Sequence, residues 1–178
     1  MSWTFTPGEQ LDYRAGAEVT VINDVLDPEI LSEARAEAEN LHVHGKHFRT
    51  NRSWGQRLCR NSAPVLVTNI SNDTINSELE RVVRGLGMEV AESLYQIWTP
   101  GSYIPWHDDG YHKGALTVYV SDHDKDDGGY FMYDDGRGIK AVKPKPNRAV
   151  FVKGGIYHCV STVNHGSGLR IAIQIWCK

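Results

Sequence analysis

The chain has 178 residues and a formal net charge of −3 at pH 7, with 40% hydrophobic and 23% charged residues. This composition is typical of a globular protein and argues against the disordered, fibrous and membrane classes. The acidic balance also argues against nucleic acid as a partner held over a large surface, because such binding needs clustered Lys and Arg.

Cysteine usage and the N-terminus bear on the compartment. Cys59, Cys159 and Cys177 are odd in number and show no C-x-x-C spacing, which disfavours a disulfide framework or a zinc knuckle. Residues 1–8 lack a basic start followed by an apolar run, and no stretch approaches the roughly 20 apolar residues of a membrane span. We expect a cytoplasmic protein with no membrane partner.

The first half of the chain predicts a strand, two helices and a long loop. A strand is expected at residues 17–22. Residues 27–41 carry a Pro at the start, acids in the first turn and strong helix formers, and so predict a helix. Capping residues and an apolar face predict a second helix over 72–86. The polar stretch 42–64 is expected to form a long loop over the functional site.

After Glu89 the pattern changes to short runs rich in Val, Ile, Tyr and Trp, separated by turn sequences that contain Gly and Pro. Short strands with such turns indicate a sandwich or barrel of the jelly-roll type, so the expected fold is mainly β with N-terminal helices. The predicted strands are residues 93–99, 103–108, 115–121, 128–133, 138–143, 148–152, 156–163 and 168–176.

A His-x-Asp motif ends one of these strands, in the segment from Trp106 to Gly110. His107 and Asp109 stand at positions i and i+2, so in an extended segment both side chains leave the same face and can bind one ion. A motif this short also occurs for ordinary hydrogen bonding, and its interpretation depends on the rest of the chain.

Two later residues make a metal site the better interpretation. His158 begins an apolar strand about 50 residues further on, and Arg170 lies in the last strand. Two His and one carboxylate on one side of an ion leave the other side open, as in non-haem iron(II) oxygenases. Arg170 lies among Ile and Ala, where an unpaired charge is costly, so we expect an anionic partner such as the distal carboxylate of a dicarboxylate.

Further motifs accompany these residues in a fixed order. They are Trp98-Thr-Pro-Gly-Ser-Tyr103 ahead of the His-x-Asp, Asp127-Gly-Gly-Tyr130, Val142-Lys-Pro-Lys-Pro-Asn-Arg148 before Phe151, His158-x-Val160, and Arg170 with Trp176. In this order, residues 93–176 resemble the 2-oxoglutarate-dependent oxygenases, and among them the prolyl-4-hydroxylase-like members.

The resemblance implies a fold, cofactors and iron ligands. It implies that residues 91–178 form a double-stranded β-helix of the jelly-roll or cupin-like type. The length fits one domain, in which residues 1–90 supply the predicted supporting helices and an N-terminal strand. The cofactor is iron(II), and 2-oxoglutarate and O2 are co-substrates. His107, Asp109 and His158 correspond to the iron ligands and hence to the catalytic residues.

The resemblance also implies residues that bind the co-substrate. Arg170 corresponds to the residue that holds the C5 carboxylate of 2-oxoglutarate. Tyr103 matches a tyrosine placed shortly before the His-x-Asp, although here it stands four residues ahead of the first His. Trp176 matches an indole near the metal. One departure is Ala172, where many relatives have Ser or Thr.

The function implied is a dioxygenase that hydroxylates an unactivated C–H bond. Asp109 as third ligand favours hydroxylation, because halogenating relatives leave that position to a halide. We expect a peptide or protein substrate, with a prolyl side chain first, and the alternative is a free amino acid or small metabolite. A non-catalytic cupin-like barrel that binds a metal or sugar shares the fold but has no need for Arg170. Substrate choice is expected to reside in residues 42–64 and 110–114.

Other reactive side chains receive structural interpretations. We expect exposed imidazoles at His42, His44, His47, His123 and His165, and either a solvated turn or a substrate contact at His112. Cys159 is expected to pack on the face opposite His158. Asp134 and Asp135 beside Gly136 predict a tight turn.

Overall fold

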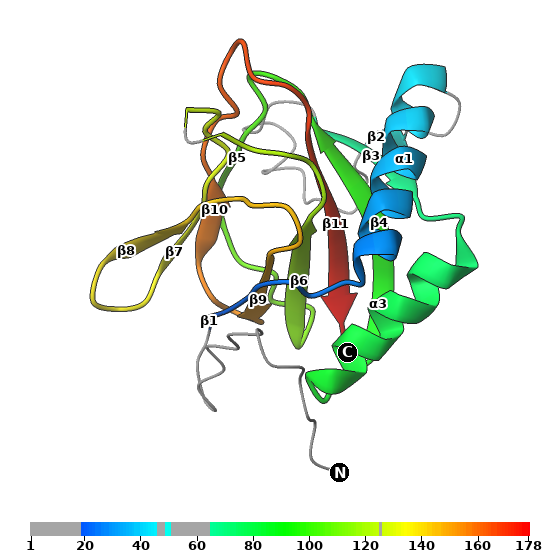
Figure 1. Cartoon of the computed structure of the whole chain (residues 1–178). Helices are drawn as coiled ribbons and strands as arrows, with labels where there is room; N and C mark the ends of the chain where they lie inside the picture. Colours follow the sequence, from blue (N-terminus) through cyan, green and yellow to red (C-terminus); the bar gives the residue numbers. More distant parts are fainter. Residues whose placement is uncertain (1–18, 46–48, 51–64, 125) are drawn as a thin grey trace.

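The computed structural model describes residues 19–45, 49–50, 65–124 and 126–178, and Figure 1 shows how their elements are arranged. In chain order the elements are β1 (Val19–Ile22), α1 (Pro28–His44), β2 (Arg49–Thr50), β3 (Val65–Asn69), α3 (Asp73–Gly85), β4 (Val90–Trp98), β5 (Ile104–His107), β6 (Gly114–Tyr119), β7 (Phe131–Asp134), β8 (Ile139–Val142), β9 (Ala149–Lys153), β10 (His158–Val160) and β11 (Arg170–Cys177).

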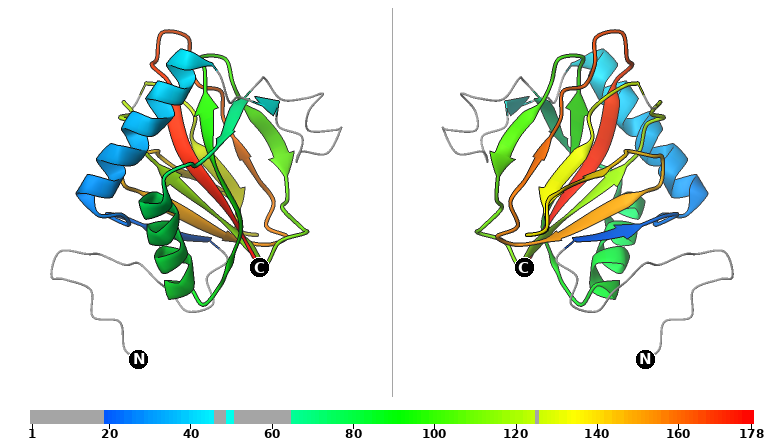
Figure 2. Two further views of the ribbon diagram at one scale, coloured as in Figure 1. Left: turned by 90° about the vertical axis from the view of Figure 1, so that its right-hand side faces the viewer. Right: turned by 90° about the vertical axis from the view of Figure 1, so that its left-hand side faces the viewer.

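The strands form two antiparallel sheets. The large sheet has the order β1-β9-β6-β11-β4-β3-β2, and the small sheet has the order β5-β10-β7-β8. The helices α1 and α3 lie against the outer face of the large sheet, and the small sheet lies on its other side (Figure 2). This arrangement is a double-stranded β-helix with two supporting helices, and the predicted fold class is confirmed.

Local sequence signals explain where α1 begins and ends. Asp27 is the N-cap, and its side chain accepts a hydrogen bond from the backbone N–H of Glu29, while Pro28 occupies the first turn. Gly45 ends the helix with φ +60°, a left-handed conformation that glycine adopts without strain. The helix at the predicted position is confirmed, and it runs one turn further than expected, to His44.

The second helix, α3, begins after Asn72, whose side chain accepts the backbone N–H groups of Thr74 and Ile75. One face of α3 is buried against the large sheet, through Ile75, Leu79, Val82 and Val83. These are the residues that the apolar pattern placed on one face, so the predicted amphipathic helix is confirmed.

The main hydrophobic core lies between the helices and the outer face of the large sheet. Strand β11 is central because it pairs with both β4 and β6. Its outward residues Ile171, Ile173 and Ile175 are at most 1% exposed, and Ala34 and Ala38 of α1 are fully buried in the same cluster. Packing of this apolar layer holds β11 in place, and the opposite face of the strand is available for a site.

The predicted strands after Glu89 are all present, with shifted ends. The clearest difference is β10, which has three residues where 156–163 was predicted. Gly155 has φ +85°, and the pairing with β5 changes register between His158 and Val160, so regular pairing is short on both sides. In addition, β2 and β3 form a large-sheet edge for which no strand was predicted.

Part of the predicted loop 42–64 belongs to regular structure. Residues 42–44 complete α1, and residues 49–50 form β2. Residues 46–48 and 51–64 lie outside the described residues, so the expected position of this segment over the site stays a prediction. Among the described helices, none is long and apolar enough to cross a bilayer.

Candidate active site

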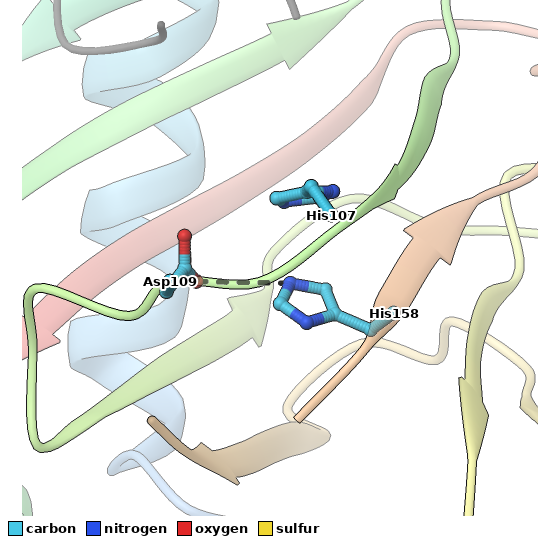
Figure 3. Close-up of side chains that lie close together, drawn as sticks. All are labelled: His107, Asp109 and His158. Carbon is cyan, nitrogen blue, oxygen red and sulfur yellow. Dashed lines mark ion pairs between the residues drawn. The ribbon is translucent and has the colours of Figure 1, made fainter. Parts of the chain in front are cut away.

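The side chains of His107, Asp109 and His158 meet at one end of the small sheet (Figure 3). His107 ends β5 and His158 begins β10, and the antiparallel register places the two residues directly opposite each other, with ring centroids 4.3 Å apart. Asp109 reaches them from the turn after β5, with its Oδ2 3.6 Å from His158 Nε2. One ligand atom from each side chain lies within 4.8 Å of the others.

Both histidines are oriented in the same way. Nδ1 of His107 lies 2.8 Å from the carbonyl oxygen of Pro105, and Nδ1 of His158 lies 2.8 Å from that of Ile156, two residues earlier in each case. A carbonyl only accepts, so each Nδ1–H donates and each Nε2 keeps its lone pair. A backbone contact of this kind orients a metal-binding imidazole and sets its tautomer.

The surroundings keep His107 uncharged. Burial lowers the pKa of His107, and the nearby His158 lowers it further. The ring of Phe131 packs on His158, with centroids 5.2 Å apart. Two imidazoles beside a carboxylate match the two-His, one-carboxylate donor set of non-haem iron(II) sites. This chain's residues therefore fit iron(II).

Arg170 carries a buried charge with unsatisfied donors. The residue is 2% exposed, and among the described residues neither Nε nor Nη1 has a hydrogen-bond partner. The guanidinium carbon lies 4.6 Å from the ring centroid of Trp98 and 5.0 Å from that of Tyr119. Burial lowers the pKa of Arg170. A buried guanidinium held between π faces needs an anion, and a carboxylate matches its fork.

The metal-binding group and Arg170 open into one cavity between the two sheets. The cavity is lined by Gln96, Trp98, Ile104, His107, Asp109, Ala115, Thr117, Phe131, Val152, His158, Val160, Arg170, Gln174 and Trp176. Since a dicarboxylate with a metal-chelating head requires a metal and a guanidinium in one cavity, the residues present also fit 2-oxoglutarate.

Trp176 lines the cavity as predicted, and it is 6% exposed. The structure does not bring Tyr103 to the cavity. Its neighbours Ser102 and Ile104 are buried, whereas Tyr103 is 38% exposed. Side chains alternate in an extended segment, so an inward Ile104 leaves Tyr103 pointing outward. A binding role for Tyr103 in this conformation is therefore not supported.

Polar residues that the sequence interpretation did not assign also belong to the site. Gln96 and Gln174 are buried in the cavity wall, and Thr117 Oγ1 donates to Gln174 Oε1 over 2.7 Å. The hydroxyl of Tyr119, beside Arg170, is buried without a hydrogen-bond partner among the described residues. Alternation along β6 and β11 was the available signal, but it is informative only once the two strands are known to pair.

The remaining histidines differ from one another. His44 and His165 are exposed, as predicted, whereas His42 is half-buried and His47 lies outside the described residues. His112 is half-buried, with its ring 5.9 Å from that of Trp176, so the predicted turn lies beside the cavity. The prediction for His123 is wrong. Its side chain is only 2% exposed, because the loop after β6 folds back over it.

Two structural interpretations agree with the structure. Cys159 is buried, and burial raises its pKa to about 11, which leaves the thiol protonated and unreactive. The turn between β7 and β8 contains Asp134 and Asp135, whose carboxylates accept the backbone N–H groups of Gly136 and Arg137. These carboxylates stabilise a turn.

Comparison with known proteins agrees with this site. Residues 93–178 match the family model described as the 2OG-Fe(II) oxygenase superfamily, whose members use iron(II), 2-oxoglutarate and O2. A search of curated proteins gives no significant match.

Solved structures of similar fold include proteins of different activity. A prolyl-4-hydroxylase of Pseudomonas putida is 15% identical, with 90% of this chain and 92% of that chain covered and a TM-score of 0.64. A Trichoplax adhaerens prolyl hydroxylase, in complex with a hypoxia-inducible-factor peptide, is 18% identical, with 90% and 83% covered and a TM-score of 0.70. The epimerase SnoN of nogalamycin biosynthesis is 13% identical, with 90% and 77% covered and a TM-score of 0.70.

At these identities the structures show a shared fold, and the family rests on the matched sequence region. That region contains the three side chains that meet at the end of the small sheet, together with the buried Arg170 and Trp176. Residues 93–178 of this chain belong to the 2OG-Fe(II) oxygenase superfamily.

Proposed function

We propose that this chain is an iron(II)- and 2-oxoglutarate-dependent dioxygenase that hydroxylates an unactivated C–H bond of a peptidyl side chain, with proline as the first candidate. The observation that carries the proposal is a single cavity that holds both the His107, Asp109 and His158 group and the unsatisfied guanidinium of Arg170. A barrel that only bound a metal or a sugar would gain nothing from a buried, unpaired Arg.

The residues of the cavity have two roles, metal binding and co-substrate binding. His107, Asp109 and His158 hold the ion, and Arg170 binds the C5 carboxylate and so aims the other end of 2-oxoglutarate at the metal. Iron(II) bound there supplies the redox chemistry by which R–H, O2 and 2-oxoglutarate give R–OH, succinate and CO2. Because Arg170 is 2% exposed, its contact with the carboxylate is made away from bulk water, which strengthens it.

A peptidyl substrate is supported by the likeness to prolyl hydroxylases, one of which was solved with a peptide. A small-molecule substrate is the second candidate, because SnoN has the same TM-score of 0.70 to this chain as the peptide-bound structure. The turn of residues 110–114 lies beside Trp176, through His112, and we propose that it contacts substrate. The same role for residues 46–48 and 51–64 is a prediction only.

Iron binding tests the site. We expect one iron(II) per chain under anaerobic conditions, and loss of this binding in His107→Ala and His158→Ala, since each variant lacks one of three protein ligands. His165→Ala, which changes an exposed imidazole, is the matched control. Asp109→Ala should end hydroxylation. Full metal retention in both His variants would show that the metal is held elsewhere.

The substrate class is tested separately. The iron-loaded protein is incubated with 2-oxoglutarate, O2 and either proline-containing peptides or free amino acids, and products are analysed by mass spectrometry for one added oxygen atom. Succinate formed without any substrate oxidation would support the reaction class but not the substrates tried. Oxidation of free amino acids alone would favour the second candidate.

A further inference from the structure

The turn at Gly128 and Gly129 lies against the side chain of Arg170. A Cβ atom on Gly129 would lie 2.8 Å from Cδ of Arg170 and 3.2 Å from Cγ2 of Val163. Gly129 also has φ +61°, which glycine adopts without strain. The backbone of Gly129 therefore packs directly against the aliphatic part of the Arg170 side chain. The guanidinium of Arg170 makes no hydrogen bond from Nε or Nη1 to any described residue.

This turn is fixed on one side by the segment that leads from β10 to β11. Gly129 donates its N–H to the carbonyl of Thr162 over 2.9 Å, and Gly128 forms a β-bridge with Val163. Asn164 donates its N–H to the carbonyl of Asp127 over 2.8 Å. These contacts leave the carbonyl of Gly128 to be satisfied from the other side.

His123 supplies that contact. Its side chain is 2% exposed, and its Nε2 lies 2.6 Å from the carbonyl oxygen of Gly128, so Nε2–H donates. Nδ1 is 3.9 Å from Oδ2 of Asp127, too far for a hydrogen bond. Burial lowers the pKa of His123, and this effect outweighs the opposite effect of the hydrogen bond to Gly128; the charge of Arg170 lowers the pKa further, and that of Asp127 raises it. A neutral ring that donates from Nε2 is the consistent state.

We infer that His123 is a positioning residue for 2-oxoglutarate, acting through the Gly128–Gly129 turn on the stem of Arg170. The inference rests on the proposed function, because it takes the C5 carboxylate as the anion of Arg170. The aromatic faces of Trp98 and Tyr119 do not fix the direction of the guanidinium fork as hydrogen bonds would. The backbone of Gly129 packs against the aliphatic part of the Arg170 side chain and so limits the orientation of the guanidinium. The hydrogen bond from His123 to Gly128 keeps this backbone in place.

The test separates the distal carboxylate from the chelating head. Iron-loaded protein is titrated anaerobically with 2-oxoglutarate and with pyruvate, which has the same 2-oxo acid head but no distal carboxylate, and the iron(II)–chelate absorption band is followed. His123→Leu should weaken 2-oxoglutarate binding about 3- to 10-fold, the effect of one lost hydrogen bond. Binding of pyruvate and of iron(II) should stay at the level of the parent.

His123→Gln should restore most of the affinity, because its amide N–H can donate to the Gly128 carbonyl. His165→Leu, in an exposed loop, is the matched control. If His123→Leu folds poorly, Gly129→Ala tests the same path from its other end, since its Cβ would displace Arg170.

Three outcomes would overturn the inference: parental 2-oxoglutarate binding in His123→Leu, parental binding in a folded Gly129→Ala, or an equal loss for pyruvate and 2-oxoglutarate. Its failure is distinguishable from failure of the proposed function. If the proposed function were wrong, Arg170→Ala itself would bind 2-oxoglutarate as tightly as the parent does.

Discussion

The two faces of β11 are both buried, but they bury different chemistry. The outward residues Ile171, Ile173 and Ile175 belong to the apolar core under α1 and α3. The inward face presents Arg170 and Gln174 to the cavity. Burial by itself therefore does not distinguish a residue that supports the fold from one that serves the reaction. The difference is whether the buried atoms are satisfied within the protein, and for Arg170 they are not.

The same contrast appears in two buried tyrosines. Tyr95, on the outer face of β4, donates its hydroxyl to Glu37 of α1 over 2.8 Å and so ties the helix to the sheet. Tyr119, beside Arg170, has a buried hydroxyl without a partner among the described residues. Unsatisfied polar atoms gathered around one cavity, at Arg170 and Tyr119, are the arrangement expected when a ligand supplies the missing contacts.

The largest expected effect on stability is on the outer face. Ile173→Ala removes a fully buried side chain and leaves a cavity, so the free energy of unfolding should fall by about 2–5 kcal/mol. Denaturant titration measures the change. Ile139→Ala in β8, where the side chain is 63% exposed, is the control and should change it by less than about 0.5 kcal/mol. A loss in Ile173→Ala no larger than in this control would refute the assignment of that face to stability.

On the inner face the large effect should be on ligand binding. Arg170→Ala removes the charge-assisted contacts to the C5 carboxylate, and 2-oxoglutarate binding should weaken by about one to two orders of magnitude. Iron binding should persist, and Arg170→Lys, which keeps the charge without the fork, should fall between the two. Anaerobic titration of the iron-loaded protein measures both. Equal use of 2-oxoglutarate and pyruvate by the parent would contradict this placement of the co-substrate.

The two tyrosines give a smaller and more discriminating comparison. Tyr95→Phe loses a hydrogen bond to a carboxylate and should lower the free energy of unfolding by about 1.5 kcal/mol. Tyr119→Phe removes a hydroxyl that makes no hydrogen bond of normal geometry with the described residues but interacts with the nearby Arg170, so the free energy of unfolding of the unliganded protein should fall by less than in Tyr95→Phe. Denaturant titration of both variants tests the contrast, and similar losses in the two would contradict it.

The pH dependence of stability offers a control for Tyr95. Burial raises the pKa of Tyr95 above its ordinary value near 10, and the contact with Glu37 raises it further. Above pH 10 the unfolded chain therefore loses a proton that the folded chain retains, and stability falls as pH rises. Tyr95→Phe lacks this contribution, so the difference in stability between parent and variant should shrink above pH 10.

Local signals predicted the elements well because each depends on neighbouring residues. Asp27 with Pro28, and Asn72 before α3, are capping signals that act within one turn. The strand β3 was not predicted, although its sequence from Val65 to Asn69 is rich in β-branched residues, because its identity depends on pairing with β4. The buried state of His123 was missed for a similar reason, since a contact with Gly128 in a folded-back loop leaves no local pattern.

The sequence alone determined the donor set: the spacing of His107 and Asp109, the later His158 and the improbable Arg170 in an apolar strand indicate the chemistry, because residue type and alternation are local properties. Only the tertiary structure decided which side chains meet. The pairing of β5 with β10 places the two histidines opposite each other, and the pairing of β6 with β11 brings Tyr119 to Arg170 while Tyr103 points away. Strand register joins residues distant in sequence, and no local pattern encodes it.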